Sequence, residues 1–225
     1  MSNEDQIPHI KGIESLKDFY ESNKKNINIA GIAAILLLAG VYYYFKFYKP
    51  SVETDAKDSF FMAERYFGQD SLNLALNGDG MNLGMINIAD EYGSTKTGNL
   101  ATYYAGVILL KQGKYQEALD YIKDVDMEDE IMAAQVLTLQ GDCYSELGDY
   151  KAAGKKYRAA ADKRDNEMTA PYALKKAGVA FEEAGELNDA LDAYTDLFED
   201  YNKVSSEMNV ESYIARVKAK IAAKK

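Results

Sequence analysis

Few side chains in this sequence could carry acid–base, nucleophilic or metal chemistry. The 225 residues include one histidine, His9, which lies in a polar N-terminal tail, and one cysteine, Cys143. A catalytic triad or a zinc site needs several such side chains, and a disulfide within the chain needs two cysteines. We therefore predict no catalytic residue, no metal site, no cofactor and no small-molecule substrate, and expect a protein that is not an enzyme.

The remaining candidate motifs are explained better by structure than by chemistry. Gly78-Asp79-Gly80 resembles part of a phosphate or calcium loop, but no Gly-Lys-Ser/Thr follows it and the closing Glu of an EF-hand is not at its place. A turn is the prediction here. Solvated helix faces account for the carboxylate clusters at 126–130, 182–183 and 196–200. Cys143 is expected to be a small buried thiol.

The overall composition indicates a folded chain whose partners are proteins. Hydrophobic residues make up 47% of the sequence and charged residues 28%, which is typical of folded domains. With 26 Lys and Arg against 36 Asp and Glu, the formal charge is −10, and this disfavours binding to the phosphates of nucleic acids. We interpret the chain as a membrane-tethered interaction protein.

The run from Ile27 to Phe47 is the strongest single signal, and it predicts a transmembrane helix over 27–48. It contains one charge, Lys46, and its length at about 1.5 Å per residue matches the ~30 Å of a bilayer core. Aromatic side chains gather at its C-terminal end, as they do at membrane interfaces. The residues that we expect to anchor the chain in lipid are Ile27, Leu36, Leu37, Leu38, Tyr42, Tyr43 and Tyr44.

Other interpretations of this run fit less well. A buried core helix is rarely so long and apolar in a small domain. A cleaved signal peptide needs small residues before its cleavage site, whereas this run continues into bulky Tyr and Phe. A lipoprotein signal needs a Cys after Leu38-Ala39-Gly40, where Val41 stands. An uncleaved anchor is therefore the prediction.

The orientation of the anchor is not decided by charge, because three lysines flank each end. A short tail inside and a long domain outside is the simplest topology. In a bacterium it places the N-terminus in the cytoplasm and the C-terminal domain in the periplasm, with a single pass through the inner membrane. Residues 1–26 form the expected cytoplasmic tail, in which Ile13, Leu16, Phe19 and Tyr20 are spaced for one face of a short helix.

A pattern of small and aromatic residues recurs three times after residue 100. Its first glycine recurs after 35 and then 37 residues, and its alanine does the same. The recurring positions are the first glycines Gly106, Gly141 and Gly178, the second glycines Gly113, Gly148 and Gly185, and the alanines Ala118, Ala153 and Ala190. Each copy predicts a pair of antiparallel helices.

Each recurring position has a physical reason. The first glycine lies where the second helix crosses closely, and the second glycine ends the first helix because Gly adopts the left-handed conformation at little cost. The alanine lets the two helices touch. The return helices are predicted to begin at Tyr115, Tyr150 and Leu187, and these residues are expected to pack back on the pair. The space between neighbouring pairs is expected to be filled by Tyr144 with Tyr157 and by Phe181 with Tyr194.

This pattern resembles the tetratricopeptide repeat (TPR), a helix–turn–helix unit of about 34 residues. Three features depart from the family. Its Trp near the start of the first helix is replaced by Thr102, Leu137 and Leu174, and its closing Pro is missing. The third repeat also needs two extra residues, near the turn before Pro171. The predicted fold class is all-α, a transmembrane helix followed by a TPR-like α-solenoid with three repeats over 101–203.

Further helices are expected on both sides of the repeats. Over 49–100 we predict a degenerate pair, with helices over Val52–Phe67 and Leu83–Tyr92 separated by the turn at 77–80. Over 204–225 we predict a capping helix, Ser206–Lys224, because the last pair of a solenoid otherwise exposes an apolar face.

The concave face, lined by the first helix of each repeat, is the predicted peptide-binding surface. Counted from the repeat glycines, its residues grade from apolar to polar along the chain. The groove residues are Tyr103, Val107 and Leu110 in the first repeat, Thr138, Asp142 and Ser145 in the second, and Lys175, Val179 and Glu182 in the third.

The whole layout resembles the YfgM-like family of ancillary subunits of the protein translocon. The segment from Asp70 to Gly106, with ALNGDG at 75–80 and NLATYYAG at 99–106, is similar to members from Bacteroidota-type bacteria. The resemblance implies an inner-membrane protein that associates with the SecYEG channel and with PpiD, a membrane-anchored periplasmic chaperone of the prolyl-isomerase type. It also implies a role in assisting unfolded client chains as they leave the channel.

Two other functions stay open. A membrane-tethered TPR scaffold for another cell-envelope assembly would share the fold and differ in the partner. An enzyme would be indicated if a substitution scan found one carboxylate indispensable while folding stayed intact.

Overall fold

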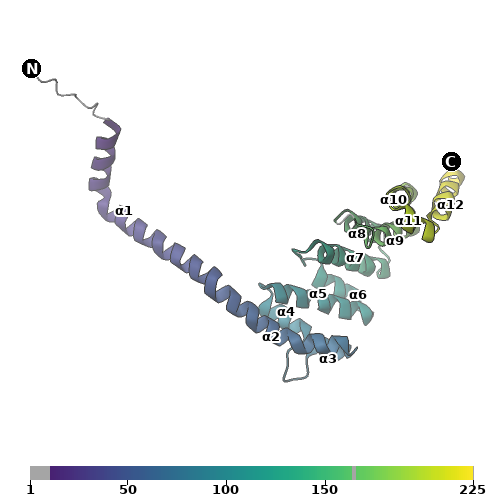
Figure 1. Ribbon diagram of the computed structural model, residues 1–225, viewed down its shortest axis with the longest axis horizontal. Coiled ribbons are helices and arrows are strands. Elements are labelled where there is room, and N and C mark those ends of the chain that lie inside the picture. Colours follow the sequence, from purple (N-terminus) through teal and green to yellow (C-terminus); the bar gives the residue numbers. More distant parts are fainter. Residues whose placement is uncertain (1–10, 164–165, 225) are drawn as a thin grey trace, which may run out of the picture. The chain divides into compact units, whose positions relative to one another are not determined.

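The computed structural model describes residues 11–163 and 166–224, and these residues contain helices and no strand. The all-α prediction is confirmed for this part of the chain, while His9 lies outside the described residues. The chain divides into two compact units after Val52. Figure 1 shows the order of the helices along the chain.

The described part of the first unit belongs to one long helical segment that continues to Gly68. Helix α1 (Lys11–Tyr43) runs into a π-helical turn, η1 (Tyr44–Tyr48), and from there into α2 (Lys49–Gly68). The turn lies directly before Pro50, whose ring clashes with the carbonyl four residues earlier in a regular helix. Within the turn, the N–H of Lys49 donates to the carbonyl of Tyr44, five residues back. The predicted short helix of the tail is therefore continuous with the predicted anchor.

The apolar part of this segment is long enough to cross a membrane. The helical segment spans Lys17–Gly68, and none of its most apolar window is buried inside the protein. The leucines Leu36, Leu37 and Leu38 are each about two-thirds exposed, and the tyrosines Tyr42 and Tyr43 are similarly open. An apolar helix that serves as the core of its own chain would be buried, so the core-helix interpretation is wrong for this structure.

The second unit begins where α2 meets the start of α5 (Lys96–Lys111). The carboxylate of Glu53 accepts hydrogen bonds from the backbone N–H of Lys96 (2.9 Å) and from Oγ1 of Thr97 (2.8 Å). Partial burial raises the pKa of Glu53, but the bonds from Thr97 and Lys96 outweigh it and hold the pKa below its ordinary value. The charged side chain thus satisfies donors at the positive end of α5.

Two short helices lie between α2 and α5. They are α3 (Leu72–Asn77), which the sequence analysis did not predict, and α4 (Met85–Tyr92). The predicted turn between them is confirmed: Gly78 and Gly80 have φ of 82° and 90°. Asp79 closes the loop by accepting bonds from the N–H groups of Met81 and Asn82 and from the hydroxyl of Tyr66. These bonds, led by that of Tyr66, hold the pKa of Asp79 far below its usual range.

Three helix pairs follow, and each return helix begins at the predicted residue. The pairs are α5 with α6 (Tyr115–Ile122), α7 (Glu130–Glu146) with α8 (Tyr150–Lys163), and α9 (Ala170–Glu183) with α10 (Leu187–Asp200). The turn glycines Gly113, Gly148 and Gly185 have φ of 76°, 81° and 76°. Of the three first residues of the return helices, Leu187 is buried and Tyr150 is exposed, so only part of the expected packing at these positions is present.

The first glycine of each pair lies at a close helix crossing, as predicted. A Cβ at Gly141 would overlap with the ring of Tyr157, and one at Gly178 would overlap with the ring of Tyr194. These two tyrosines therefore pack inside their own pair, whereas we expected them between pairs. Phe181 does reach across, because its ring lies against Gly154 of the preceding pair.

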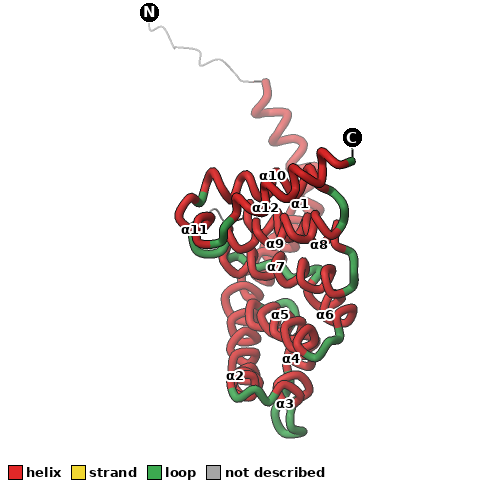
Figure 2. The backbone as a smooth tube through the Cα atoms, turned by 90° about the vertical axis from the view of Figure 1, so that its right-hand side faces the viewer, coloured by secondary structure: helices red, strands yellow, loops and turns green. Residues whose placement is uncertain are grey.

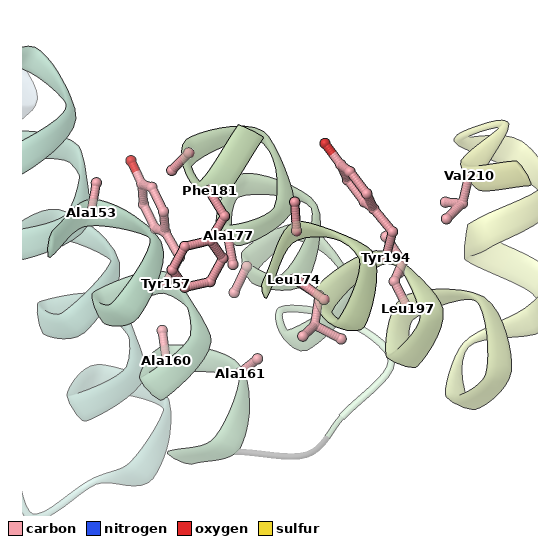
Figure 3. Close-up of a cluster of buried hydrophobic side chains, with 14 of the residues drawn as sticks. Ala153, Tyr157, Ala160, Ala161, Leu174, Ala177, Phe181, Tyr194, Leu197 and Val210 are labelled. Atoms are coloured by element: carbon pink, nitrogen blue, oxygen red, sulfur yellow. The ribbon is translucent and has the colours of Figure 1, made fainter. Parts of the chain in front are cut away.

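The buried side chains form two clusters in the second unit. One extends from α2 to α7 and the other from α7 to the C-terminal helices, and Tyr144 packs against both. Figure 3 shows part of the second cluster, with the rings of Tyr157 and Tyr194 between neighbouring helices. Small residues such as Ala153 and Ala190 are fully buried, which allows the helices to approach closely.

The C-terminal segment differs from the single capping helix that we expected. It consists of α11 (Asn202–Glu207) and α12 (Val210–Ala223), divided at Asn209, whose φ of 54° is left-handed. Asn tolerates this conformation better than most residues. The side chains of Val210 and Val217 are fully buried, and the ring of Tyr213 stacks on that of Tyr194 at 5.2 Å. Figure 2 shows α12 beside α10.

Replacing Gly178 with Ala is expected to lower the free energy of unfolding by about 1–3 kcal/mol, because the added methyl group must displace the ring of Tyr194. The measurement is urea unfolding of the full chain in mild detergent, followed by circular dichroism. The matched control is Gly68→Ala, where nothing lies within 4 Å of the added atom. Equal stability of the two variants would contradict the close crossing.

Candidate functional site

The nine predicted groove residues occupy the first helices of the three pairs. Their spacing of four and then three residues places each trio on one face of its helix. All nine keep some exposure. Five of them line two adjoining depressions on this face, namely Leu110, Asp142, Ser145, Lys175 and Val179.

The first depression is mostly apolar and lies between α7, α8 and α9. Its volume is about 240 Å³, and its apolar lining comes from Tyr150, Val179 and Ala180. Val179 is 42% exposed, so its side chain is available for contact.

The second depression is more polar and lies between α5, α7 and α9. Its volume is about 330 Å³, and its lining includes Leu110, Tyr115 and Glu146. The hydroxyl of Tyr115 bonds to the carboxylate of Glu146, which raises the pKa of Tyr115. This bond holds the carboxyl group of Glu146 beside the depression.

A three-residue polar cluster lies where the two depressions meet. Oδ1 of Asp142 accepts from the hydroxyl of Tyr157 at 2.6 Å and from Nζ of Lys176 at 2.7 Å. The same ammonium lies 5.3 Å from the centre of the Tyr157 ring. Burial, and then the bond to Asp142, raise the pKa of Tyr157 far above its usual range. Tyr157 is therefore a fixed donor that orients Asp142.

Glu182 is not available in the groove, contrary to the prediction. Its side chain is only 5% exposed and accepts two bonds from Arg216 of α12, with Nη2 at 2.6 Å from Oε1 and Nε at 3.1 Å from Oε2. Nζ of Lys220 lies 3.1 Å from Oε2. Lys175 also faces α12, since its ammonium lies 5.5 Å from the centre of the Tyr213 ring. The C-terminal helix therefore covers this end of α9.

Tyr103, Val107 and Thr138 lie outside the two depressions. The ring of Tyr103 packs edge-on against that of Tyr104 at 5.7 Å, and burial raises the pKa of its hydroxyl. The hydroxyl of Thr138 donates to the carbonyl of Ala134 within its own helix. These three residues contribute mainly to the packing of the helix pairs and line neither depression.

Seven lining residues were not predicted as part of the groove: Tyr115, Glu146, Tyr150, Tyr157, Lys176, Ala180 and Glu183. The three tyrosines belong to the second helices, which the sequence analysis treated as packing elements. A signal was present for Lys176, because it lies 34 residues after Asp142 and Arg216 lies 34 residues after Glu182. One repeat length therefore separates the two members of each ion pair.

Within residues 11–163 and 166–224, no three His, Cys, Asp or Glu side chains are placed to hold a metal ion. Cys143 is fully buried, which confirms the predicted small buried thiol, and burial raises the pKa of this thiol to about 11.

No protein-family model matches the chain, and no curated protein matches it.

Replacing Glu182 with Gln is expected to lower the free energy of unfolding at pH 7 by about 1–2 kcal/mol, because two cations lose their buried partner. Burial raises the pKa of Glu182, but Arg216 and Lys220 outweigh it and the net pKa lies below 4.5. The carboxylate of Glu182 thus binds a proton more tightly in the unfolded chain than in the folded chain.

The stabilisation from Glu182 is accordingly complete above pH 4.5 and lost as the pH falls through the lower, folded pKa. Urea unfolding of both chains between pH 3 and 7 measures the difference. We expect the gap between wild type and variant to close in acid. A gap that is unchanged at pH 3 would contradict the proposed ion pair.

Proposed function

We propose that this protein is a membrane-anchored TPR-like protein that assists newly translocated chains at the SecYEG channel together with a PpiD-like periplasmic chaperone. The observation that carries the proposal is the direct connection of an unburied apolar helix to a series of helix pairs with a partly open face. Such a chain has the means to hold a peptide-binding surface close to a membrane.

The TPR-like part of the proposal is supported by the recurring glycines. They recur at intervals of 35 and 37 residues, close to the family repeat of about 34. In each pair one glycine lies in the turn with a positive φ and another lies at the crossing of the two helices. Helix α12 buries Val210 and Val217 beside α10, which is consistent with a capping helix at the end of a solenoid.

The membrane part is supported by the length and exposure of the helical segment. Its leucines Leu36, Leu37 and Leu38 are each about two-thirds exposed, and a bilayer core would bury them. The aromatic rings around η1 include two stacked pairs, Tyr43 with Phe47 and Tyr44 with Tyr48, at the end of the apolar run where an interface is expected. We place the N-terminus in the cytoplasm and the second unit in the periplasm.

The translocon part rests on the resemblance of the whole layout to the YfgM-like family. A tethered scaffold for another envelope assembly is the second candidate. The same observations support this scaffold, because a membrane tether and a binding surface do not identify the partner.

Site-specific photo-crosslinking separates the two candidates. A crosslinker at Tyr48 is expected to capture a SecYEG subunit, and one at Ser145 is expected to capture PpiD or a nascent client. The matched control is a crosslinker at Lys155, an exposed residue of α8 that lines neither depression. If neither Tyr48 nor Ser145 yields channel or chaperone adducts while other envelope proteins are captured, the scaffold is favoured.

Protease treatment of spheroplasts tests the orientation. The second unit is expected to be digested from outside in intact spheroplasts, because it is proposed to lie in the periplasm. A cytoplasmic protein that stays intact serves as the control for leakage. Digestion only after lysis would place the second unit in the cytoplasm and exclude a periplasmic role.

A further inference from the structure

We propose that the two adjoining depressions bind an extended polypeptide segment that carries a large apolar side chain and, two residues away, a basic side chain. The apolar side chain enters the first depression, lined by Tyr150 and Val179, and the basic one reaches Glu146 in the second. The inference deepens the proposed function, because it names the chemistry of the segment that the face recognises.

The sizes of the depressions indicate side chains as their occupants. Their volumes of about 240 and 330 Å³ lie at or below the lower end of the usual range for small-molecule sites, which is about 300 Å³. They share Ser145, Tyr157 and Lys176, so they are immediate neighbours. In an extended chain, side chains two residues apart point to the same side and lie about 7 Å apart, which suits two adjoining subsites.

The charges of the lining favour a basic side chain over an acidic one. The second depression holds two carboxylates, Asp142 and Glu146, and a single ammonium, that of Lys176. That ammonium is already engaged by Asp142 at 2.7 Å. The bond from the Tyr115 hydroxyl holds the carboxyl group of Glu146 beside the opening. An incoming Lys or Arg therefore meets a net negative subsite.

The charge of the surrounding protein acts in the same direction. Residues 51–225 contain 20 Lys and Arg against 31 Asp and Glu, a net charge of −11. A surface of this sign attracts basic segments and repels acidic ones over the ~8 Å range that physiological salt allows. Affinity for the segment is therefore expected to fall as the salt concentration rises.

Fluorescence anisotropy with labelled peptides tests the proposal on the full chain in lipid nanodiscs, with empty nanodiscs as the blank. The probe contains Phe-Ser-Arg within a Gly/Ser sequence, and the comparison peptides contain Phe-Ser-Glu and Ala-Ser-Arg. We expect the Phe-Ser-Arg peptide to bind more tightly than either, by at least threefold. Binding of the Phe-Ser-Glu peptide that is equal or tighter would overturn the proposal.

Two substitutions assign the subsites. Glu146→Gln is expected to weaken binding of the Phe-Ser-Arg peptide about three- to fivefold, as for loss of one exposed ion pair. Val179→Ser is expected to weaken it by about three- to tenfold, because part of the apolar contact is lost. Both residues are exposed, so neither change removes buried packing. The matched control Glu91→Gln removes the same charge from exposed α4, away from both depressions.

An effect of Glu91→Gln as large as that of Glu146→Gln would show that only overall charge matters, and would overturn the assignment of the subsites. Absence of binding by every peptide would overturn the inference itself. The crosslinking experiment at Tyr48 reports the association with the channel independently. Channel adducts without peptide binding would therefore reject this inference and leave the proposed function standing. Peptide binding without channel adducts would reject the proposed association with the translocon and leave this inference standing.

Discussion

The close crossing of the two helices in each pair is the constraint on which the rest of the second unit depends. At Gly141 and Gly178 the first helix has no side chain, and an aromatic ring from the return helix occupies the space. The ring of Tyr157 is thereby buried while its hydroxyl emerges on the groove face and bonds to Asp142. A larger residue at the crossing would move the ring, and with it the polar cluster between the two depressions.

Ion pairs that span one repeat length connect successive elements across this face. Asp142 of α7 pairs with Lys176 of α9, and Glu182 of α9 pairs with Arg216 of α12. On the side of the return helices, Lys151 pairs with Glu186. In this arrangement α12 takes the position that the first helix of another pair would have, and its cations neutralise the last carboxylate of the series. The face therefore stays open between α5 and α9 and is covered beyond them.

Local signals in the sequence were sufficient to predict the turns, the helix crossings and the long apolar helix. Gly113, Gly148 and Gly185 adopt a positive φ because few other residues do so at low cost, and this preference is independent of tertiary contacts. The short α3 and the division of the C-terminal segment at Asn209 were not foreseen. Both depend on packing: six residues are too few for a helix to be stable alone, and Asn209 ends α11 where α12 turns to bury Val210 and Val217.

The sequence by itself determined where the helices turn and cross, because glycine and alanine recur at the spacing of paired helices. It also determined that the first fifty residues carry a long apolar segment. It did not determine that the rings of Tyr157 and Tyr194 pack inside their own pairs. Only the tertiary structure decided which polar groups remain available. Asp142 and Glu182 both lie on the first helices of their pairs, yet α12 covers Glu182 and leaves Asp142 beside an open depression. That difference arises from residues more than thirty positions away in the chain, and therefore no local pattern contains it.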